Sequence, residues 1–163
     1  MNFSPFFNAT PVIQIHMITA IAAFFLGAAV LWRRKGGLGH RVAGYMWVAL
    51  MLITSFSAFF IHEIRMWGEW SPIHLLAVSV PLALIFAIHA ARKRKLNLHR
   101  RIMQRTYLGG MIIAGGFTFL PGRLNYRILF SDGGGSAVHI LWLMPLFLGL
   151  AGFVLLSRRN AVH

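Results

Sequence analysis

Five apolar stretches, each followed by a short polar or basic segment, limit the possible folds of this chain more than any other feature. A helix needs roughly 20 apolar residues to cross a bilayer core of about 30 Å. Strands standing alone in lipid would leave backbone groups without partners, so all five stretches are expected to be helices. The fourth is short and rich in glycine, and it could begin nearer Ile102. The five predicted spans are Pro11–Trp32, Val42–Ile61, Ile73–Ala91, Thr106–Leu120 and Val138–Leu156.

The composition agrees with an all-α, polytopic membrane protein that forms one integral membrane domain over residues 1–163. The chain is 58% hydrophobic and only 12% charged, whereas soluble domains are about 25% charged. Its net charge of +13 could suggest nucleic acid, but the basic residues sit in clusters between the apolar stretches, as on the cytoplasmic side of membrane proteins. No nucleic-acid partner is therefore expected. The absence of cysteine excludes disulfides and thiolate metal sites.

The basic clusters also predict the orientation. Thirteen of the 16 basic residues lie between spans one and two, between spans three and four, or after span five. The N-terminus is therefore predicted outside and the C-terminus inside a bacterial cytoplasmic membrane, with anionic lipids at the inner loops. The first span is expected to be retained and not cleaved as a signal peptide. The outer side keeps three arginines and all three acids: Arg65, Arg123, Arg127, Glu63, Glu69 and Asp132.

Spans two and three share a layout with spans four and five. Each pair opens on a His-Arg dipeptide, and the two dipeptides begin at His40 and His99, 59 residues apart. Arg65 and Arg123 follow the outward helices, and the next inward helices open with His74 and His139. Both copies run in the same direction, which predicts a pseudo-twofold axis along the membrane normal. Such an axis would place His74 opposite His139 and His40 opposite His99.

Seven histidines form two predicted layers. Imidazole is an axial ligand of haem iron and a common ligand of Zn and Cu. We therefore expect a haem b protein, with His74 and His139 as first-choice axial ligands and electron transfer from a membrane quinol as its role. Arg65 and Arg123 would hold haem propionates, which suit bidentate guanidinium bonding. The outer layer is His16, His62, His74 and His139, and a weaker inner set is His40, His89 and His99.

Other interpretations stay open. Histidine, like Trp and Tyr, also favours the membrane interface for its own sake, which would suit a non-catalytic membrane subunit or an assembly partner without a cofactor. A Zn or Cu site used for transport or hydrolysis is a third possibility. Whether the protein is an enzyme, a homo-oligomer or the subunit of a larger complex stays open at this point. Small residues such as Ala23 and Gly27 favour close helix packing, and the glycines at 109, 110, 115 and 116 could instead make room for a flat cofactor.

Four segments together resemble a known family. They are GHRVAGYMWV, SPIHLL, LHRRIMQRTYLGG and GGFTFLPGRLNYRILF, and the resemblance covers most of the chain, about spans one to four and the following loop. The combination is similar to the bacterial predicted membrane proteins called domain of unknown function 2306. That resemblance implies a small polytopic inner-membrane protein with His-Arg motifs before alternate helices, and it implies no activity. The duplicated layout is also analogous to membrane cytochromes of the b561 group, although their histidine spacing is not reproduced.

Overall fold

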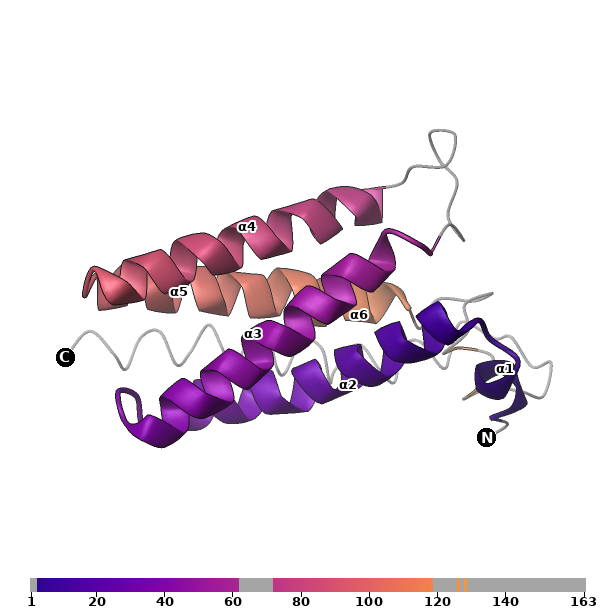
Figure 1. Ribbon diagram of the computed structural model, residues 1–163, viewed down its shortest axis with the longest axis horizontal. Helices are drawn as coiled ribbons and strands as arrows, with labels where there is room; N and C mark the ends of the chain where they lie inside the picture. Colours follow the sequence, from indigo (N-terminus) through magenta and orange to yellow (C-terminus); the bar gives the residue numbers. More distant parts are fainter. Residues whose placement is uncertain (1–2, 62–71, 119–125, 127, 129–163) are drawn as a thin grey trace. The chain divides into compact units, whose positions relative to one another are not determined.

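The computed structural model describes residues 3–61, 72–118, 126 and 128, and every regular element in these ranges is a helix (Figure 1). The all-α class is therefore confirmed for this part of the chain. One compact unit comprises Ala9–Met111, and the other comprises Met1–Asn8 together with Ile112–His163. The helices are α1 (Ser4–Phe7), α2 (Pro11–Trp32), α3 (Leu38–Ala58), α4 (Pro72–Arg92), α5 (Leu96–Tyr107), the π-helix η1 (Leu108–Ile113) and α6 (Ala114–Phe117).

The unit Ala9–Met111 is an antiparallel helical bundle. Helix α2 packs against α3, α3 against α4, and α4 against α5, while α5 also contacts α2. The α2–α3 and α4–α5 connections lie at the same end of this unit (Figure 1). We call this the basic end, because both connections carry the clustered arginines and lysines. The arrangement fits the predicted placement of these clusters on one side of a membrane, while the orientation and the repeat stay predictions.

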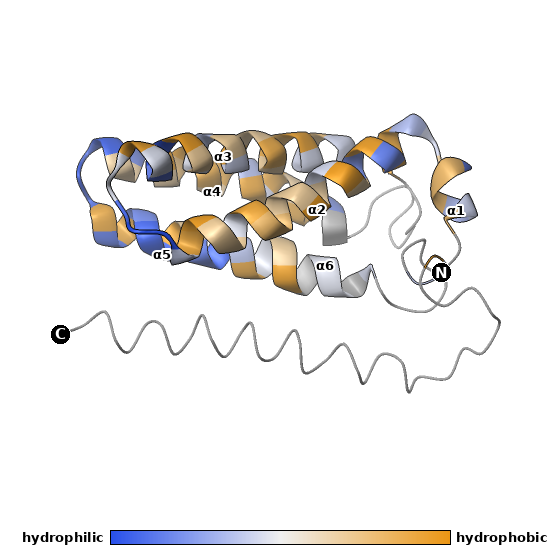
Figure 2. Ribbon diagram, turned by 90° about the horizontal axis from the view of Figure 1, so that it is seen from below, coloured by the Kyte–Doolittle hydropathy of each residue, from blue (hydrophilic) through white to orange (hydrophobic). Residues whose placement is uncertain are grey.

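Three helices are long and apolar enough to cross a bilayer: Pro11–Trp32, Leu38–Ala58 and His74–Arg92. Figure 2 shows many apolar residues along these helices. Large apolar side chains on them are exposed, among them Phe25, Phe56 and Phe86. Small polar side chains on α3, in contrast, are buried: Thr54, Ser55 and Ser57. A bundle in water would show the opposite pattern, so this distribution fits lipid as the surrounding solvent. The fifth predicted span lies outside the described residues.

The helix boundaries follow local chemistry more closely than hydropathy. Helix α2 has the predicted bounds, because Pro11 fits the first helical position, where its missing N–H costs nothing. Helix α3 begins at Leu38 and not at the predicted Val42, so His40 lies within its first turn. Gly36, with φ of 92°, makes the left-handed bend before it. A prediction from hydropathy misses this turn because its residues are polar, although polar residues at a membrane interface can be helical.

Helix α5, which corresponds to the start of the fourth predicted span, also begins earlier than predicted, at Leu96. Its first part is basic and amphipathic, and it therefore gave no apolar signal. The α4–α5 connection that precedes it is a Schellman motif, in which the Lys95 N–H bonds to the Ala90 carbonyl at 2.9 Å and the Arg94 N–H to the Ala91 carbonyl at 3.0 Å. Arg94 occupies the left-handed position with φ of 57°, where glycine is usual. The turn holds α4 and α5 as adjacent antiparallel helices.

Aromatic side chains join three helices at the centre of the bundle. Tyr107 of α5 is 1% exposed, and its hydroxyl donates to the Phe24 carbonyl of α2 at 3.0 Å. The Trp47 ring of α3 lies 6.4 Å from the Tyr107 ring, centroid to centroid. Both rings cover Gly27, where an added Cβ would meet them. The predicted small-residue face of Ala23 and Gly27 therefore receives aromatic rings and not a second backbone.

Candidate functional site

The described histidines of the bundle fall into two layers. His16 and His74 lie near the beginnings of α2 and α4, at the end opposite the basic end, whereas His40, His89 and His99 lie at the basic end (Figure 1). The separation arises because α2 and α4 run parallel to each other, while α3 and α5 run the other way. The remaining predicted site residues lie outside the described residues: His62, His139, Arg65 and Arg123.

His16 is held by α3 through its Nδ1 atom. This nitrogen lies 3.0 Å from the Thr54 carbonyl and 3.0 Å from the Ser57 hydroxyl. A carbonyl can only accept, so Nδ1 carries the proton and the neutral ring keeps its electron pair on Nε2. The Thr54 hydroxyl in turn donates to the Thr19 hydroxyl at 2.9 Å, which donates to the Ile15 carbonyl at 2.8 Å. A short polar network thus fixes the orientation of His16 between two apolar helices.

His74 flanks the same end of α3. It is only 3% exposed, and its ring lies 6.4 Å from the Phe59 ring, centroid to centroid. Its helix begins at Pro72, one residue before the predicted span, which places His74 in the first turn. Its predicted partner His139 is outside the described residues, so their opposition stays a prediction.

His40 and His99 both lie at the basic end. The His99 Nδ1 atom donates to the Ala87 carbonyl of α4 at 2.9 Å, which leaves the electron pair on Nε2. His40 lies close enough to His99, Lys35 and Arg33 for their charges to interact with its ring. The buried Nδ1 atom of His40 has no hydrogen-bond partner within the described part of the chain. The two imidazoles therefore lie at the same end of the bundle, and their predicted pairing stays a prediction.

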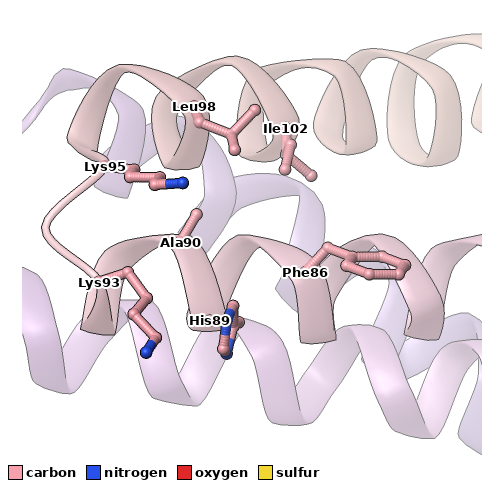
Figure 3. A pocket seen from close by; sticks show the side chains of 7 residues that line it. All are labelled: Phe86, His89, Ala90, Lys93, Lys95, Leu98 and Ile102. Atoms are coloured by element: carbon pink, nitrogen blue, oxygen red, sulfur yellow. The ribbon is translucent and has the colours of Figure 1, made fainter.

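His89 takes a different place from the other two inner histidines. It is exposed on α4 and lines an open groove of about 450 Å³ between α4 and α5. Figure 3 shows Lys95 extending between the two helices, while His89 and Lys93, which follows the last residue of α4, point away from α5. The predicted inner set thus separates into a His40–His99 pair and a basic groove.

The described histidines offer imidazole nitrogens that could bind a metal ion or a haem iron. The described ranges contain no group of three or more His, Cys, Asp or Glu placed to hold a metal ion. Two imidazole nitrogens are enough for the two axial positions of a haem iron. Neutral histidine whose other N–H is bound to a backbone carbonyl is the form that metals use.

Sequence reasoning missed the residues that orient these histidines. Thr54 and Ser57 hold His16, and the Ala87 carbonyl holds His99. One signal was available for the first: the segment TSFS at 54–57 places three small polar residues inside an apolar span. In lipid such side chains turn inward and bond to other helices. A backbone carbonyl gives no comparable signal.

Comparison with known proteins identifies the family. A family of predicted membrane proteins, DUF2306, matches residues 13–118. This chain belongs to the DUF2306 family. The resemblance inferred from the four motifs is thereby confirmed. No curated protein and no solved structure matches the chain.

The DUF2306 match covers the bundle that holds both histidine layers. It begins two residues into α2 and ends just after α6. His16, His40, His74 and His99 are therefore part of the shared family region, whereas His139 and Arg123 lie beyond it. As a predicted membrane protein of this family with three candidate spans, the chain has lipid bilayer as its environment.

Proposed function

We propose that this protein is a haem b-binding electron carrier of the bacterial cytoplasmic membrane, which holds the haem iron between paired histidines. One observation carries the proposal. His99 donates its Nδ1–H to the Ala87 carbonyl at 2.9 Å, and His40 of another helix is near enough for the charges of the two rings to interact.

The hydrogen bond matters because it decides which nitrogen is free to bind. Metal-ligating histidines nearly always donate their other ring N–H to a carbonyl, a carboxylate or water, which fixes the tautomer and raises ligand basicity. His99 meets this condition, and on α2 His16 meets it too through Thr54. His40 adds a second imidazole whose buried Nδ1 forms no hydrogen bond to any described residue. Haem bound here would supply a one-electron couple.

The charges around the pair favour an anionic group over a bare metal dication. Lys35 and Arg33 both act on His40, and two cations repel Zn²⁺ or Cu²⁺ by the same Coulomb term that attracts a carboxylate. Haem carries two propionates, for which guanidinium is a well-matched hydrogen-bond donor. Arg33 and Lys35 would therefore anchor the propionates of an inner haem.

The outer layer would form the second site. His74 and His139 remain the first choice of ligands there, with His16 and His62 as alternatives and Arg65 and Arg123 as propionate partners. His74 and Ala87 are 13 residues apart on α4, so the layers would be about 20 Å apart along the helix. Two haems at this spacing would carry electrons from one face of the bilayer to the other, with a membrane quinol as donor. The basic connections would face anionic lipid on the inner side.

Haem titration of the purified full chain in detergent tests the inner site. Wild type should bind haem with a low-spin, bis-histidine spectrum, and His99→Ala should lose the inner site's contribution to that spectrum or convert it to high spin. His89→Ala is the matched control, because this exposed histidine lies in the groove and should leave the spectrum unchanged. Equal haem binding by wild type, His99→Ala and His40→Ala would refute the inner pair as ligands.

A further inference from the structure

Two open grooves lie between α4 and α5. One, of about 450 Å³, is lined by residues that include Phe86, Lys93 and Lys95, and the other, of about 280 Å³, is lined by residues that include Ser79 and Gly109. Ile102 lines both. The two grooves therefore meet at this side chain.

The lining residues of the two grooves follow one another along both helices. On α4 they recur at helical spacing from Leu76 to Ala90, and on the following helices from Leu98 to Gly110. Residues three or four apart are neighbours on a helix surface. Leu76 and Ala90 are 14 residues apart, or about 21 Å at 1.5 Å per residue. This length exceeds half of a bilayer core of about 30 Å.

The groove is basic at one end and apolar along its length. Lys93, Lys95 and His89 line the groove at the basic end of the bundle, where Lys95 lies between the two helices and Lys93 points away from α5 (Figure 3). Phe86, Leu98 and Ile102 continue from there as an apolar wall. A Cβ added at Gly109 would meet no atom of the described residues within 4 Å, so this glycine leaves room at the far end. None of the described residues that line the two grooves is acidic.

We propose that this groove binds one anionic phospholipid, with its phosphate at Lys93 and Lys95 and an acyl chain lying along α4 and α5 past Gly109. Charge complementarity selects the headgroup, because basic residues beside a membrane attract anionic lipids. The apolar wall and the open glycine accommodate the chain. The site differs from the histidine pairs and does not depend on haem binding.

Native mass spectrometry of the purified full chain measures this binding directly. The protein is titrated with phosphatidylglycerol and, separately, with phosphatidylcholine of the same acyl chains. Wild type should retain one phosphatidylglycerol molecule, in strong preference to phosphatidylcholine. The double variant Lys93→Gln, Lys95→Gln should bind it about thirty-fold more weakly, from the usual contribution of two basic residues. Its matched control, Arg34→Gln with Arg41→Gln, removes equal charge from the other basic connection and should bind like wild type.

A second pair of variants tests the acyl chain. Gly109→Leu should fill the open end and weaken phosphatidylglycerol binding, while Gly44→Leu makes the same change on α3, where a Cβ also meets nothing within 4 Å, and should not. If Gly109→Leu fails to fold, Ala83→Leu blocks the same groove. Equal binding of both lipids would overturn the proposal, as would equal weakening by the two charge variants or wild-type binding by the folded groove-filling variants.

Discussion

Trp47 donates its indole N–H to the backbone carbonyl of Ala23, and the two atoms are 2.9 Å apart. This bond joins α3 to α2 beside Ala23 and Gly27, the small residues that α2 buries. Tyr107 adds a third helix through its bond to Phe24. The bundle therefore depends on one position having no side chain at all.

Gly27→Ala should destabilise the bundle. The new Cβ would lie 2.6 Å from the Tyr107 ring and closer still to Trp47, and overpacking of this kind typically costs about 1–3 kcal/mol. The measurement is thermal unfolding of the purified protein in detergent, followed by circular dichroism.

Gly44→Ala is the control for that experiment. The same substitution on α3 meets nothing within 4 Å, and replacing glycine by alanine within a helix typically stabilises by about 0.5–1 kcal/mol. The two variants should therefore shift the unfolding temperature in opposite directions. A Gly27→Ala protein as stable as Gly44→Ala would mean that the aromatic rings do not cover this glycine.

The helix bounds predicted from the sequence were correct where a long apolar stretch also had clear start and stop residues. Thr10, Pro11 and the charged Arg33 delimit α2, and its bounds were correct. Hydropathy failed where a helix is polar, because the first turn of α3 and most of α5 carry arginines that lipid-crossing segments avoid. The contact of Gly27 with Trp47 and Tyr107 depends on three helices at once, so no local pattern could reveal it.

The candidate site was predictable in part. Sequence layout placed His40 and His99 in one inner layer, and both lie at the basic end of the bundle. It grouped His89 with them, but helical geometry turns His89 to the exposed groove. The bonds that fix His16 and His99 end on backbone carbonyls or small hydroxyls, whose partners emerge only after the helices pack. The outer pair of His74 and His139 stays a prediction.

Arg94→Gly should stabilise the α4–α5 connection. Arg94 has φ of 57° in the Schellman motif, and a side chain in this left-handed conformation costs about 1 kcal/mol that glycine avoids. The gain should appear as a higher unfolding temperature in detergent. Arg34→Gly removes the same charge from the other connection, at a residue without positive φ, and should give no gain. Equal shifts for both variants would attribute the effect to charge instead.

Single cysteines should report the orientation without background, because the chain has none of its own. Lys35→Cys and Lys93→Cys lie in the two connections of the basic end, whereas Thr10→Cys lies at the start of α2. An impermeant maleimide applied to intact bacterial spheroplasts should label Thr10→Cys alone. In inverted membrane vesicles it should label the other two. The opposite pattern would reverse the predicted topology, and labelling of Lys35→Cys and Lys93→Cys from different sides would contradict the bundle.

The most direct test of haem binding is the reduced-minus-oxidised absorption spectrum of the full chain, purified in detergent from cells supplied with a haem precursor. The proposal predicts a Soret band and a sharp α-band on reduction with dithionite, and Ala at both His40 and His99 should remove the inner contribution to them. A well-folded preparation that shows no Soret band and no α-band would contradict the proposed function.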